Sequence, residues 1–386
     1  MSLHAKTTTV LAALVISLST PATWADDDDD DDVQRGPVQV TVDCSTQSIQ
    51  DALRRARHAR GVVVRVRGTC IEDVAIKRDG VTLQGKEPEG GAVRGTITVS
   101  AARHVAFKGL DVTGPGSGIV ATEGAQIEVS GAEVNGNEVN GIVVEQEAHA
   151  AISNSTVNSN GANLPADSIA GHGVLVTDSA SARITGSDIS GNRCDGVAVF
   201  NHSFARLVGN SIEGNSRIAS GCGAGVLVAL NSLVRSNGNA FADNQIAVGV
   251  LGTSYFRDGN FVLEGEDPGD PDVIVQVGCT RGALPGSCGE PGTDAVQIFR
   301  SSLAEFRNAE ITGEISVGGS SSFEARGSEI FGNIFASSGS GVLLRETVTG
   351  NGSLFCADGQ GGPGSPGSAF SFGDVPCGGS IPSSLP

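Results

Sequence analysis

The sequence has few aromatic residues and few cations. Phe, Trp and Tyr make up 4% of the 386 residues, with one Met and one Trp. The core must therefore be aliphatic, and the abundance of Val, Ile, Ser, Thr and Asn, with 55 Gly, predicts an all-β chain with many turns. The 25 Lys and Arg are outnumbered by 43 Asp and Glu, which gives a net charge of −18. This acidity argues against a nucleic-acid partner, whose phosphates bind Lys and Arg.

The sequence also lacks an apolar run long enough to cross a membrane, so we do not expect an integral membrane protein. The apolar run at residues 10–18 follows Lys6 and precedes Thr23 and Ala25, which are small residues at the −3 and −1 positions of a cleavage site. This pattern predicts a signal peptide over residues 1–25 and a secreted or periplasmic protein.

Seven consecutive Asp follow at residues 26–32. Such a run repels itself and favours an acidic disordered segment, which we place at residues 26–40. The alternative is a loose Ca²⁺ sink, although the run has neither the spaced ligands nor the Gly turn of a coordination loop.

Three lines of residues repeat together along the middle of the chain. The first is Gly followed by an apolar strand, as at Gly141 and Gly173, and the second is a short alternating strand such as Ala182-x-Ile184. The third is a single apolar residue followed three positions later by Asn. These Asn residues are Asn137, Asn160, Asn192, Asn215 and Asn244.

The Asn spacings are 23, 32, 23 and 29 residues, and the extra residues fall just after the Asn turn. A coil of about 23 residues with three strands, and insertions confined to one turn, predicts a solenoid in which like residues stack. Later coils shorten to 19 and 18 residues, from Ile311 to Ile330 to Val348. We therefore predict a right-handed parallel β-helix over residues 62–351, with a Gly/Pro-rich insertion at about 258–294 and a Gly/Pro/Ser-rich tail at 352–386.

A helix is expected to cap the first coil, within residues 41–61. Ile49, Ala52, Leu53 and Ala56 share one helical face, and Ser48 is the expected N-cap. The arginines of this segment are expected to be its solvated side.

Eight Cys in an exported chain predict four disulfides. The order of the repeats suggests which residues pair, and the absence of a CxxC motif argues against a metal site. The expected pairs are Cys44 with Cys70, Cys194 with Cys222, Cys279 with Cys288, and Cys356 with Cys377.

With these repeats, the N-terminal helix and the segments at residues 68–70 and 79–85, the chain resembles the pectate-lyase-like superfamily of parallel β-helices over roughly residues 44–351. The resemblance implies the fold without implying one activity. The superfamily includes polysaccharide lyases, glycoside hydrolases, esterases, epimerases, adhesins and copper-site maturation proteins, so an activity taken from it would be an analogy.

Enzymes of the superfamily tend to place catalysis on the outer face of one strand stack and its flanking turns. In this chain the outward row that follows the repeated Gly is apolar and lacks stacked carboxylates, which argues against a typical polysaccharide enzyme. The residues of this row are Val120, Val143, Leu175, Ala198 and Leu227. An apolar outer row indicates that a loop, the tail or another subunit covers it.

Polar candidates lie at both ends of that strand. The candidates for general acid/base catalysis are His172, Asp195, Asp178, His202 and Glu147. The candidate Ca²⁺ ligands are Glu123, Glu147 and Asp178, and no other cofactor is indicated. The alternative is that these side chains are polar only because turns face water.

Two functions remain open. The first is an exported β-helix that binds or processes extracellular or envelope carbohydrate, as a polysaccharide lyase, glycoside hydrolase or epimerase if it is an enzyme. The second is a non-catalytic periplasmic or surface scaffold or adhesin whose strand face docks a protein partner.

Overall fold

A computed structural model describes the chain from Gly36 onward, with gaps. The described residues are 36–85, 90–165, 168–215, 222–244, 246–259, 262–263, 294–312, 314–318, 320–331, 334–337, 340–345, 348–349 and 354–357. The expected signal peptide, the Asp run, Cys279, Cys288 and Cys377 lie outside them, as do the insertion between residues 264 and 293 and most of the tail.

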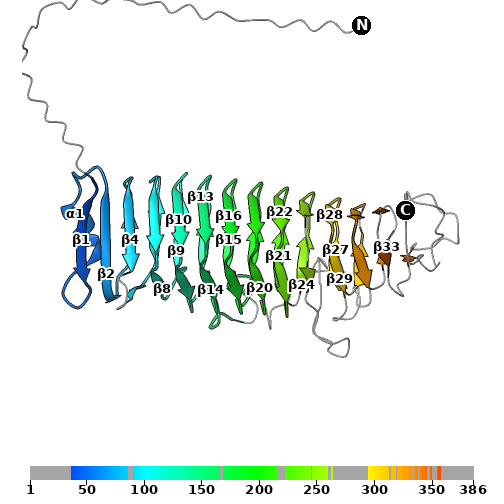
Figure 1. The fold of residues 1–386 in the computed structure, drawn as a ribbon, viewed down its shortest axis with the longest axis horizontal. Helices are drawn as coiled ribbons and strands as arrows, with labels where there is room; N and C mark the ends of the chain where they lie inside the picture. Colours follow the sequence, from blue (N-terminus) through cyan, green and yellow to red (C-terminus); the bar gives the residue numbers. More distant parts are fainter. Residues whose placement is uncertain are drawn as a thin grey trace, which may run out of the picture. The chain divides into compact units, whose positions relative to one another are not determined.

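The described residues form three parallel sheets, each containing one strand from successive coils (Figure 1). We call the three sheets A, B and C. Strand β2 (Val62–Cys70) runs from sheet A into sheet B, because it pairs with β4 (Val81–Gly85) in sheet A and with β5 (Gly91–Arg94) in sheet B. The strands pair in parallel with their counterparts in the next coil, with a register shift at Asp294, so the predicted all-β parallel β-helix is confirmed.

Sheet A consists of β1 (Val38–Asp43), β2 (Val62–Cys70), β4 (Val81–Gly85), β7 (Val105–Lys108), β10 (Gln126–Ser130), β13 (His149–Ser153), β16 (Ser181–Thr185), β19 (Phe204–Val208), β22 (Leu233–Asn237), β25 (Tyr255–Asp258), β28 (Leu303–Arg307), β31 (Ser322–Arg326) and β34 (Gly341–Arg345). Sheet B consists of the end of β2 with β5 (Gly91–Arg94), β8 (Asp111–Thr113), β11 (Glu133–Asn135), β14 (Thr156–Asn158), β17 (Asp188–Ser190), β20 (Ser211–Glu213), β23 (Ala240–Ala242), β26 (Val262–Leu263), β29 (Glu310–Thr312), β32 (Glu329–Phe331) and β35 (Val348–Thr349). Sheet C consists of β3 (Val74–Ile76), β6 (Ile97–Ser100), β9 (Ile119–Thr122), β12 (Ile142–Val144), β15 (Val174–Val176), β18 (Val197–Val199), β21 (Ala224–Val228), β24 (Ile246–Val250), β27 (Asp294–Ile298), β30 (Glu314–Val317), β33 (Ile334–Ser337) and β36 (Leu354–Ala357).

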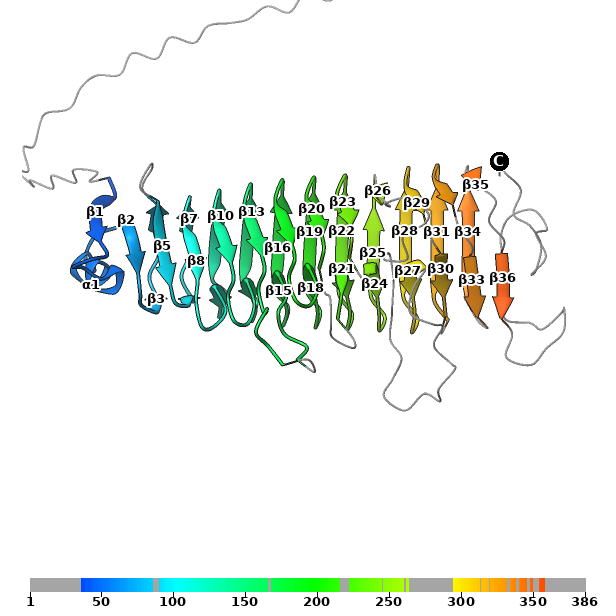
Figure 2. The same cartoon turned by 90° about the horizontal axis from the view of Figure 1, so that it is seen from below.

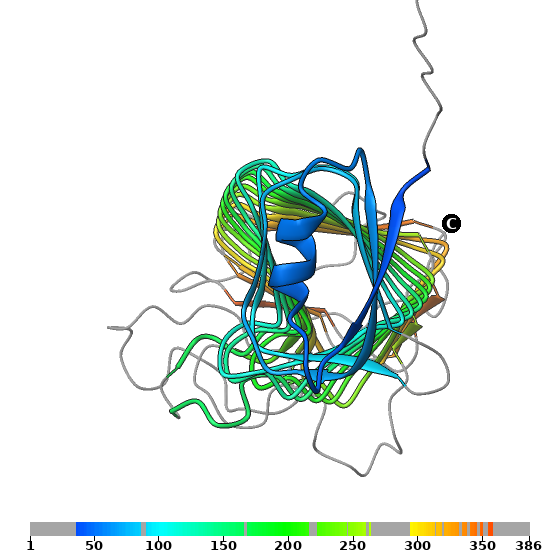
Figure 3. The ribbon, with the colours of Figure 1, turned by 90° about the vertical axis from the view of Figure 1, so that its left-hand side faces the viewer.

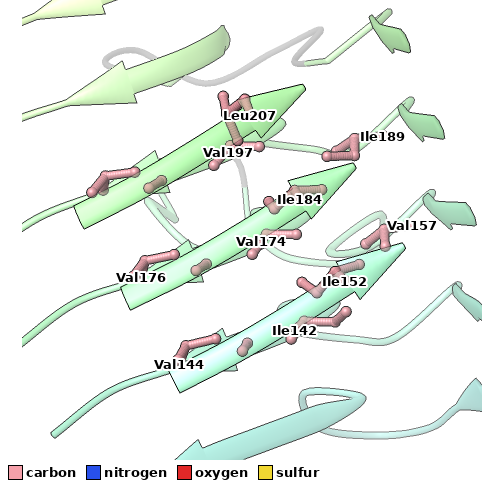
Figure 4. Close-up of a cluster of buried hydrophobic side chains, with 14 of the residues drawn as sticks. Ile142, Val144, Ile152, Val157, Val174, Val176, Ile184, Ile189, Val197 and Leu207 are labelled. Carbon is pink, nitrogen blue, oxygen red and sulfur yellow. The ribbon is translucent and has the colours of Figure 1, made fainter. Parts of the chain in front are cut away.

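The core lies inside the coils, where the inward residues of the three sheets meet. Figure 4 shows Ile142, Val174 and Val197 of sheet C stacked with the inward residues of the other sheets. The expectation of a purely aliphatic core is wrong in the later coils of sheet A. There Phe256, Phe306 and Phe323 are buried and stack with ring centroids 5.6 and 5.7 Å apart. Phe256 and Phe323 share one register position with Ala304 between them, and Phe306 fills the space beside Ala304 from the other inward position of its own strand.

The repeated Asn residues form a ladder inside the turn between sheets B and C. The Nδ2 of Asn192 donates to the Oδ1 of Asn215 at 3.0 Å and to the backbone oxygen of Val157 at 3.0 Å. The Oδ1 of Asn192 accepts from the backbone N–H and the Nδ2 of Asn160. The Asn192 amide therefore satisfies buried backbone groups of the preceding coil and also bonds to the Asn side chains of both neighbouring coils.

The ladder also explains the Gly that precedes each strand of sheet C. A Cβ on Gly173 would lie 2.7 Å from the Nδ2 of Asn192 and 2.7 Å from the backbone oxygen of Gly196. Only Gly lets the chain pass this close to the next coil.

The predicted capping helix is present as α1 (Ile49–Arg55), and it lies over the end of the first coils (Figure 3). The Oγ of Ser48 accepts the N–H of Asp51, and Ile49, Ala52 and Leu53 are buried. Glu72 accepts further bonds from the backbone N–H groups of Ile49 and Gln50. In the described part of the chain α1 is the one helix, and its seven residues are too few to cross a bilayer.

Strands also occur outside the solenoid limits expected from the repeats. At the N-terminal end β1 pairs in parallel with β2, and at the C-terminal end β36 pairs with β33 (Figure 2). The predicted solenoid ends at Asn351, the last repeat Asn, which directly precedes β36, and no repeat Asn precedes β1. Cys44 and Cys70 form the disulfide expected between the cap segment and the first coil.

Candidate functional site

The turn after sheet C carries four of the candidate residues predicted from sequence, and all four face outward. Glu123, Glu147, Asp178 and His202 are exposed, and each has a positive φ between 55° and 62°. Asp178 accepts a bond of 3.0 Å from the Nδ2 of Asn201 in the next coil. The proposed Ca²⁺ ligands thus stack coil upon coil without converging on a common point.

The turn before sheet C, in contrast, holds its polar candidate residues in the interior. His172 precedes β15 and is 5% exposed, and Asp195 precedes β18 and is 1% exposed. The Nδ1 of His172 lies 3.2 Å from the Oδ2 of Asp195, so the structure brings together the pair predicted from sequence. The ring of His172 meets the edge of Phe200 with centroids 6.1 Å apart.

Backbone groups hold both residues of this pair in place. The Oδ1 of Asp195 accepts the N–H of Gly223 at 2.9 Å and of Ala224 at 2.8 Å. The backbone N–H of His172 donates to the Oδ1 of Asn140 at 3.0 Å. One carboxylate oxygen is therefore fixed by the next coil, and the other is left facing the imidazole.

The second predicted disulfide lies beside the pair. Cys194 and Cys222 are bonded, and both are buried. The Sγ of Cys194 is 3.6 Å from the Oδ2 of Asp195. Among the described residues, three His, Cys, Asp or Glu ligand atoms converge once, at His172, Cys194 and Asp195, within 4.8 Å of one another.

The Nδ1 of His172 has no properly aligned hydrogen-bond partner, although it is buried and close to Asp195. A buried polar atom without a hydrogen bond is costly, and it normally has a functional or structural explanation. The cluster of His172, Asp195, Cys194 and Cys222, which we call the buried cluster, is thus the first candidate site.

The apolar outer row of sheet C is not an open docking surface. Val143 and Ala198 are 6% and 0% exposed, and Val120, Leu175 and Leu227 are partly buried. The expectation that this row is covered therefore holds at Val143 and Ala198.

The outer face of sheet A carries a second candidate site, which sequence reasoning missed. Arg183, Arg206, Arg235 and Arg257 occupy one register position on four successive coils. We call these four residues the arginine row. Within the described residues, Arg183, Arg206 and Arg235 form no ion pair, and all three are exposed. The sequence pattern that could have revealed this row is the alternating strand Ala-x-Ile or Ala-x-Leu, in which Arg183 and Arg206 occupy the outward x position.

Another outward row lies two residues before the arginines, and it is polar at Ser181, before Arg183, and apolar or aromatic from Phe204 onward. Phe204, Leu233, Tyr255 and Leu303 pair in register along it, and each is partly exposed. The face thus presents a line of positive charge beside a line of apolar side chains.

The arginine row ends at Arg257, whose positive charge is paired with the carboxylate of Glu305. Glu305 faces Arg257, and it accepts bonds of 2.6 Å from the hydroxyl of Tyr255 and from the Nε of Arg307. Burial raises the pKa of Tyr255 to about 12, and its bond to Glu305 adds to this rise. Burial alone would raise the pKa of Glu305 as well, but the bonds from Tyr255 and Arg307 and the nearby guanidinium charges outweigh it and lower that pKa.

A hollow of about 590 Å³ near the cap is lined by Glu72, Asp73, Arg94 and Glu138, among others. Glu72 already caps α1, and the Oδ1 of Asp73 accepts the N–H of Thr96. The carboxylates of Glu72 and Asp73 thus have structural roles.

Solved structures of similar fold come from polysaccharide-active proteins. The A-module of the mannuronan C-5 epimerase AlgE4 from Azotobacter vinelandii matches with a TM-score of 0.51 and 13% identity, over 84% of this chain and 95% of that one. The pectate lyase Pel9A matches with a TM-score of 0.48 and 13% identity, over 74% and 76%. At such identity the likeness concerns the fold alone. No curated protein gives a significant match.

A family model described as "Periplasmic copper-binding protein (NosD)" matches residues 49–261. Copper favours imidazole and, as Cu(I), thiolate ligands. With Cys194 and Cys222 bonded, the buried cluster offers one imidazole nitrogen and one carboxylate oxygen, and its sulfur atoms are not thiolates. In this state the donor set does not fit copper.

The two disulfides agree with an oxidising compartment, and the periplasmic description of the family model agrees with it too. The chain is secreted or periplasmic, as predicted. Because the family model covers more than half of its residues, and because coils of three parallel strands fill that range, the chain belongs to the NosD family of periplasmic proteins.

Proposed function

We propose that the chain binds an acidic extracellular or envelope polysaccharide along the outer face of sheet A. The observation that carries the proposal is the arginine row, whose members Arg183, Arg206 and Arg235 are exposed and unpaired within the described residues. Binding, rather than cleavage, is the function proposed, because the predicted His172–Asp195 pair is buried away from a polymer.

The stacking of like charges is the first support. Strands in a sheet lie about 4.8 Å apart, so neighbouring guanidinium groups of the row are brought close to one another. Like charges directly opposite on neighbouring strands destabilise a sheet. A protein with a net charge of −18 has many carboxylates, yet it places none beside these three arginines in the described part. A bound polyanion would supply the missing negative charge.

The row of Phe204, Leu233 and Tyr255 is the second support. Sugar rings have apolar C–H faces that pack on aromatic and aliphatic side chains, while their carboxylate or sulfate groups pair with arginine. The coil spacing of about 4.8 Å is close to the length of one sugar unit in an extended polymer. An extended acidic glycan could thus meet one arginine per coil.

The alternative of a protein scaffold places its partner on the apolar outer face of sheet C, which must then be exposed. The expected face on sheet C is buried at Val143 and Ala198 and partly buried elsewhere. The glycan proposal is therefore the one that the surface favours.

The test compares binding of the mature chain, residues 26–386, to acidic polymers such as alginate and polygalacturonate and to neutral dextran of similar length. We expect binding to the acidic polymers alone, weakening as salt rises because the charges are exposed. The double variant Arg206→Glu/Arg235→Glu should bind about tenfold or more weakly, which corresponds to ~1.4 kcal/mol.

The matched control is Arg55→Glu/Arg103→Glu, which makes the same change of charge at exposed residues of the cap and of a turn. It should bind like the unmodified chain. The Arg206→Glu/Arg235→Glu variant should also be no less stable to heat, since three like-charge pairs along the row become two opposite-charge pairs and one like-charge pair. Equal binding of dextran and alginate, or equal loss in both double variants, would refute the proposal.

A further inference from the structure

The arginine row is followed by carboxylates in both directions along the outer face of sheet A. Toward the cap, the register position of Arg183 holds Ala151 in the preceding coil and Glu128 in the coil before that. Ala151 carries no charge, and Glu128 is exposed and repels an anion. At this register position the row therefore offers no further cation in the two coils before Arg183.

In the other direction the row ends at coils whose charges cancel within one strand. Glu305 follows Arg257 at the same register position, and its Oε2 lies 3.7 Å from the Nε of Arg257. Glu305 also accepts a bond from Arg307 on its own strand, and Glu324 and Arg326 repeat this Glu-x-Arg order on β31. Arg257 thus has a carboxylate partner, whereas the other three members of the arginine row have none among the described residues.

The rows on either side of the arginines differ in size. Phe204 and Leu233 form an apolar edge on one side and are partly exposed. On the other side Thr185 and Val208 pair in register, and both are short. A sugar ring packed on the apolar edge therefore lies beside the guanidinium groups, with its acidic group toward them.

We propose that this face recognises a run of three consecutive acidic sugar units, one for each of Arg183, Arg206 and Arg235, and that Glu305 closes the next position. The inference rests on the proposed glycan binding and specifies its ligand. Coils repeat at about 4.8 Å, so a polymer with a charge on every unit meets all three arginines. A polymer with a charge on every second unit presents its charges about two coils apart and meets at most two of them.

Glu305 sets the length of the site because it competes with a fourth acidic unit for Arg257. Its residue is 8% exposed, and the hydroxyl of Tyr255 and the Nε of Arg307 hold its two oxygens. Displacing a buried carboxylate from its partners costs more than an exposed ion pair returns. The fourth unit therefore gains little from Arg257.

The experiment measures the dissociation constants of oligogalacturonates of two, three, four and six units with the full mature chain. Salt is held at about 0.15 M, where exposed charges more than about 8 Å apart are largely screened. An exposed ion pair contributes little, so the step from two to three units should strengthen binding about threefold. From three to six units the gain should not exceed about fourfold, the number of ways in which a run of three fits into six.

A hyaluronan hexamer tests the spacing of the charges. It carries the same number of carboxylates as the galacturonate trimer, but on every second unit. We expect it to bind about threefold more weakly than the trimer, because one of the three arginines is left without a partner.

Glu305→Gln tests the end of the site, since it removes the charge and keeps an oxygen that accepts the bond from Tyr255. This variant should bind the four-unit oligomer about threefold more tightly than the unmodified chain does, and the two-unit oligomer less than about twofold more tightly. The matched control is Glu133→Gln, an exposed residue of sheet B, which should bind every oligomer like the unmodified chain. Circular dichroism should show the same β-sheet signal in both variants.

Three results would overturn the inference while glycan binding itself stands. They are equal gains for each unit from two up to six, equal binding of the galacturonate trimer and the hyaluronan hexamer, and an unchanged affinity of Glu305→Gln for the four-unit oligomer. Absence of binding to every acidic oligomer and polymer would overturn both proposals. If Glu305→Gln does not fold, the length series and the hyaluronan hexamer, measured on the unmodified chain, still decide the question.

Discussion

The turns before and after the strands of sheet C carry similar polar residues in opposite surroundings. Before the strands, Asn192, His172 and Asp195 are buried, and neighbouring coils supply most of their partners. After the strands, Asp178 and His202 are exposed and stacked. A polar group needs defined partners once water is removed, so the buried turn holds fixed geometry while the exposed turn does not depend on it.

The largest effect on stability is expected for Asn192→Ala. The substitution leaves the backbone oxygen of Val157 and the N–H of Asn160 without their buried partner. Each unsatisfied group costs roughly 1–3 kcal/mol, so we expect the free energy of unfolding to fall by about 3 kcal/mol. Urea unfolding followed by circular dichroism measures this. A loss below ~0.5 kcal/mol would show that the ladder is not a source of stability.

The cluster of Tyr255 and Glu305 is intermediate between the buried and the exposed turn. It is partly buried, and its hydrogen-bond partners lie on the outer face of sheet A. Tyr255 is the single Tyr of the chain, so phenolate absorbance reports it alone. Because the pKa of Tyr255 is raised to about 12 in the folded state, we expect its phenolate titration to have a midpoint near that pH. In denaturant the midpoint should lie near pH 10.

The sign of the pH dependence follows from these shifts. The contribution of Tyr255 to stability is present below its unfolded pKa near 10, and it is lost as the pH rises toward about 12. The lowered pKa of Glu305 acts in the other direction, so its contribution is lost as the pH falls through that value. A folded-state midpoint near 10 would mean that the phenol is neither buried nor bonded to Glu305.

The smallest effect is expected at Asp178, whose side chain is exposed and whose φ is 56°. Asn accepts this backbone conformation as well as Asp does. Asp178→Asn should thus change the free energy of unfolding by less than about 0.5 kcal/mol. A loss comparable to that of Asn192→Ala would contradict the contrast between the two turns.

The sequence predicted the fold well because the repeat is local and strict. The Gly before sheet C and the Asn of the inner turn recur together in successive coils although the coils differ in length, and they indicate register without any contact information. The pairing of Cys44 with Cys70 and of Cys194 with Cys222 followed from the same frame. The pairing of the other four cysteines stays a prediction, as do the roles of the catalytic and Ca²⁺ candidates.

Two features of the candidate sites were beyond sequence reasoning. The arginine row spans coils of unequal length, so Arg206, Arg235 and Arg257 stand at irregular spacings that become aligned only when the strands pair. The packing of Phe256 against Phe306 was also missed, because the two residues occupy different register positions, Phe256 opposite Ala304 and Phe306 opposite Asp258.

The amino-acid sequence by itself determined the coil, its capping helix and the inward rows, because these depend on alternation and on turn residues within one or two repeats. The tertiary structure decided which polar residues are buried together and which share a surface. His172 and Asp195 are 23 residues apart and meet only because one coil stacks on the next, and the same stacking removes water from that turn while the other turn stays exposed.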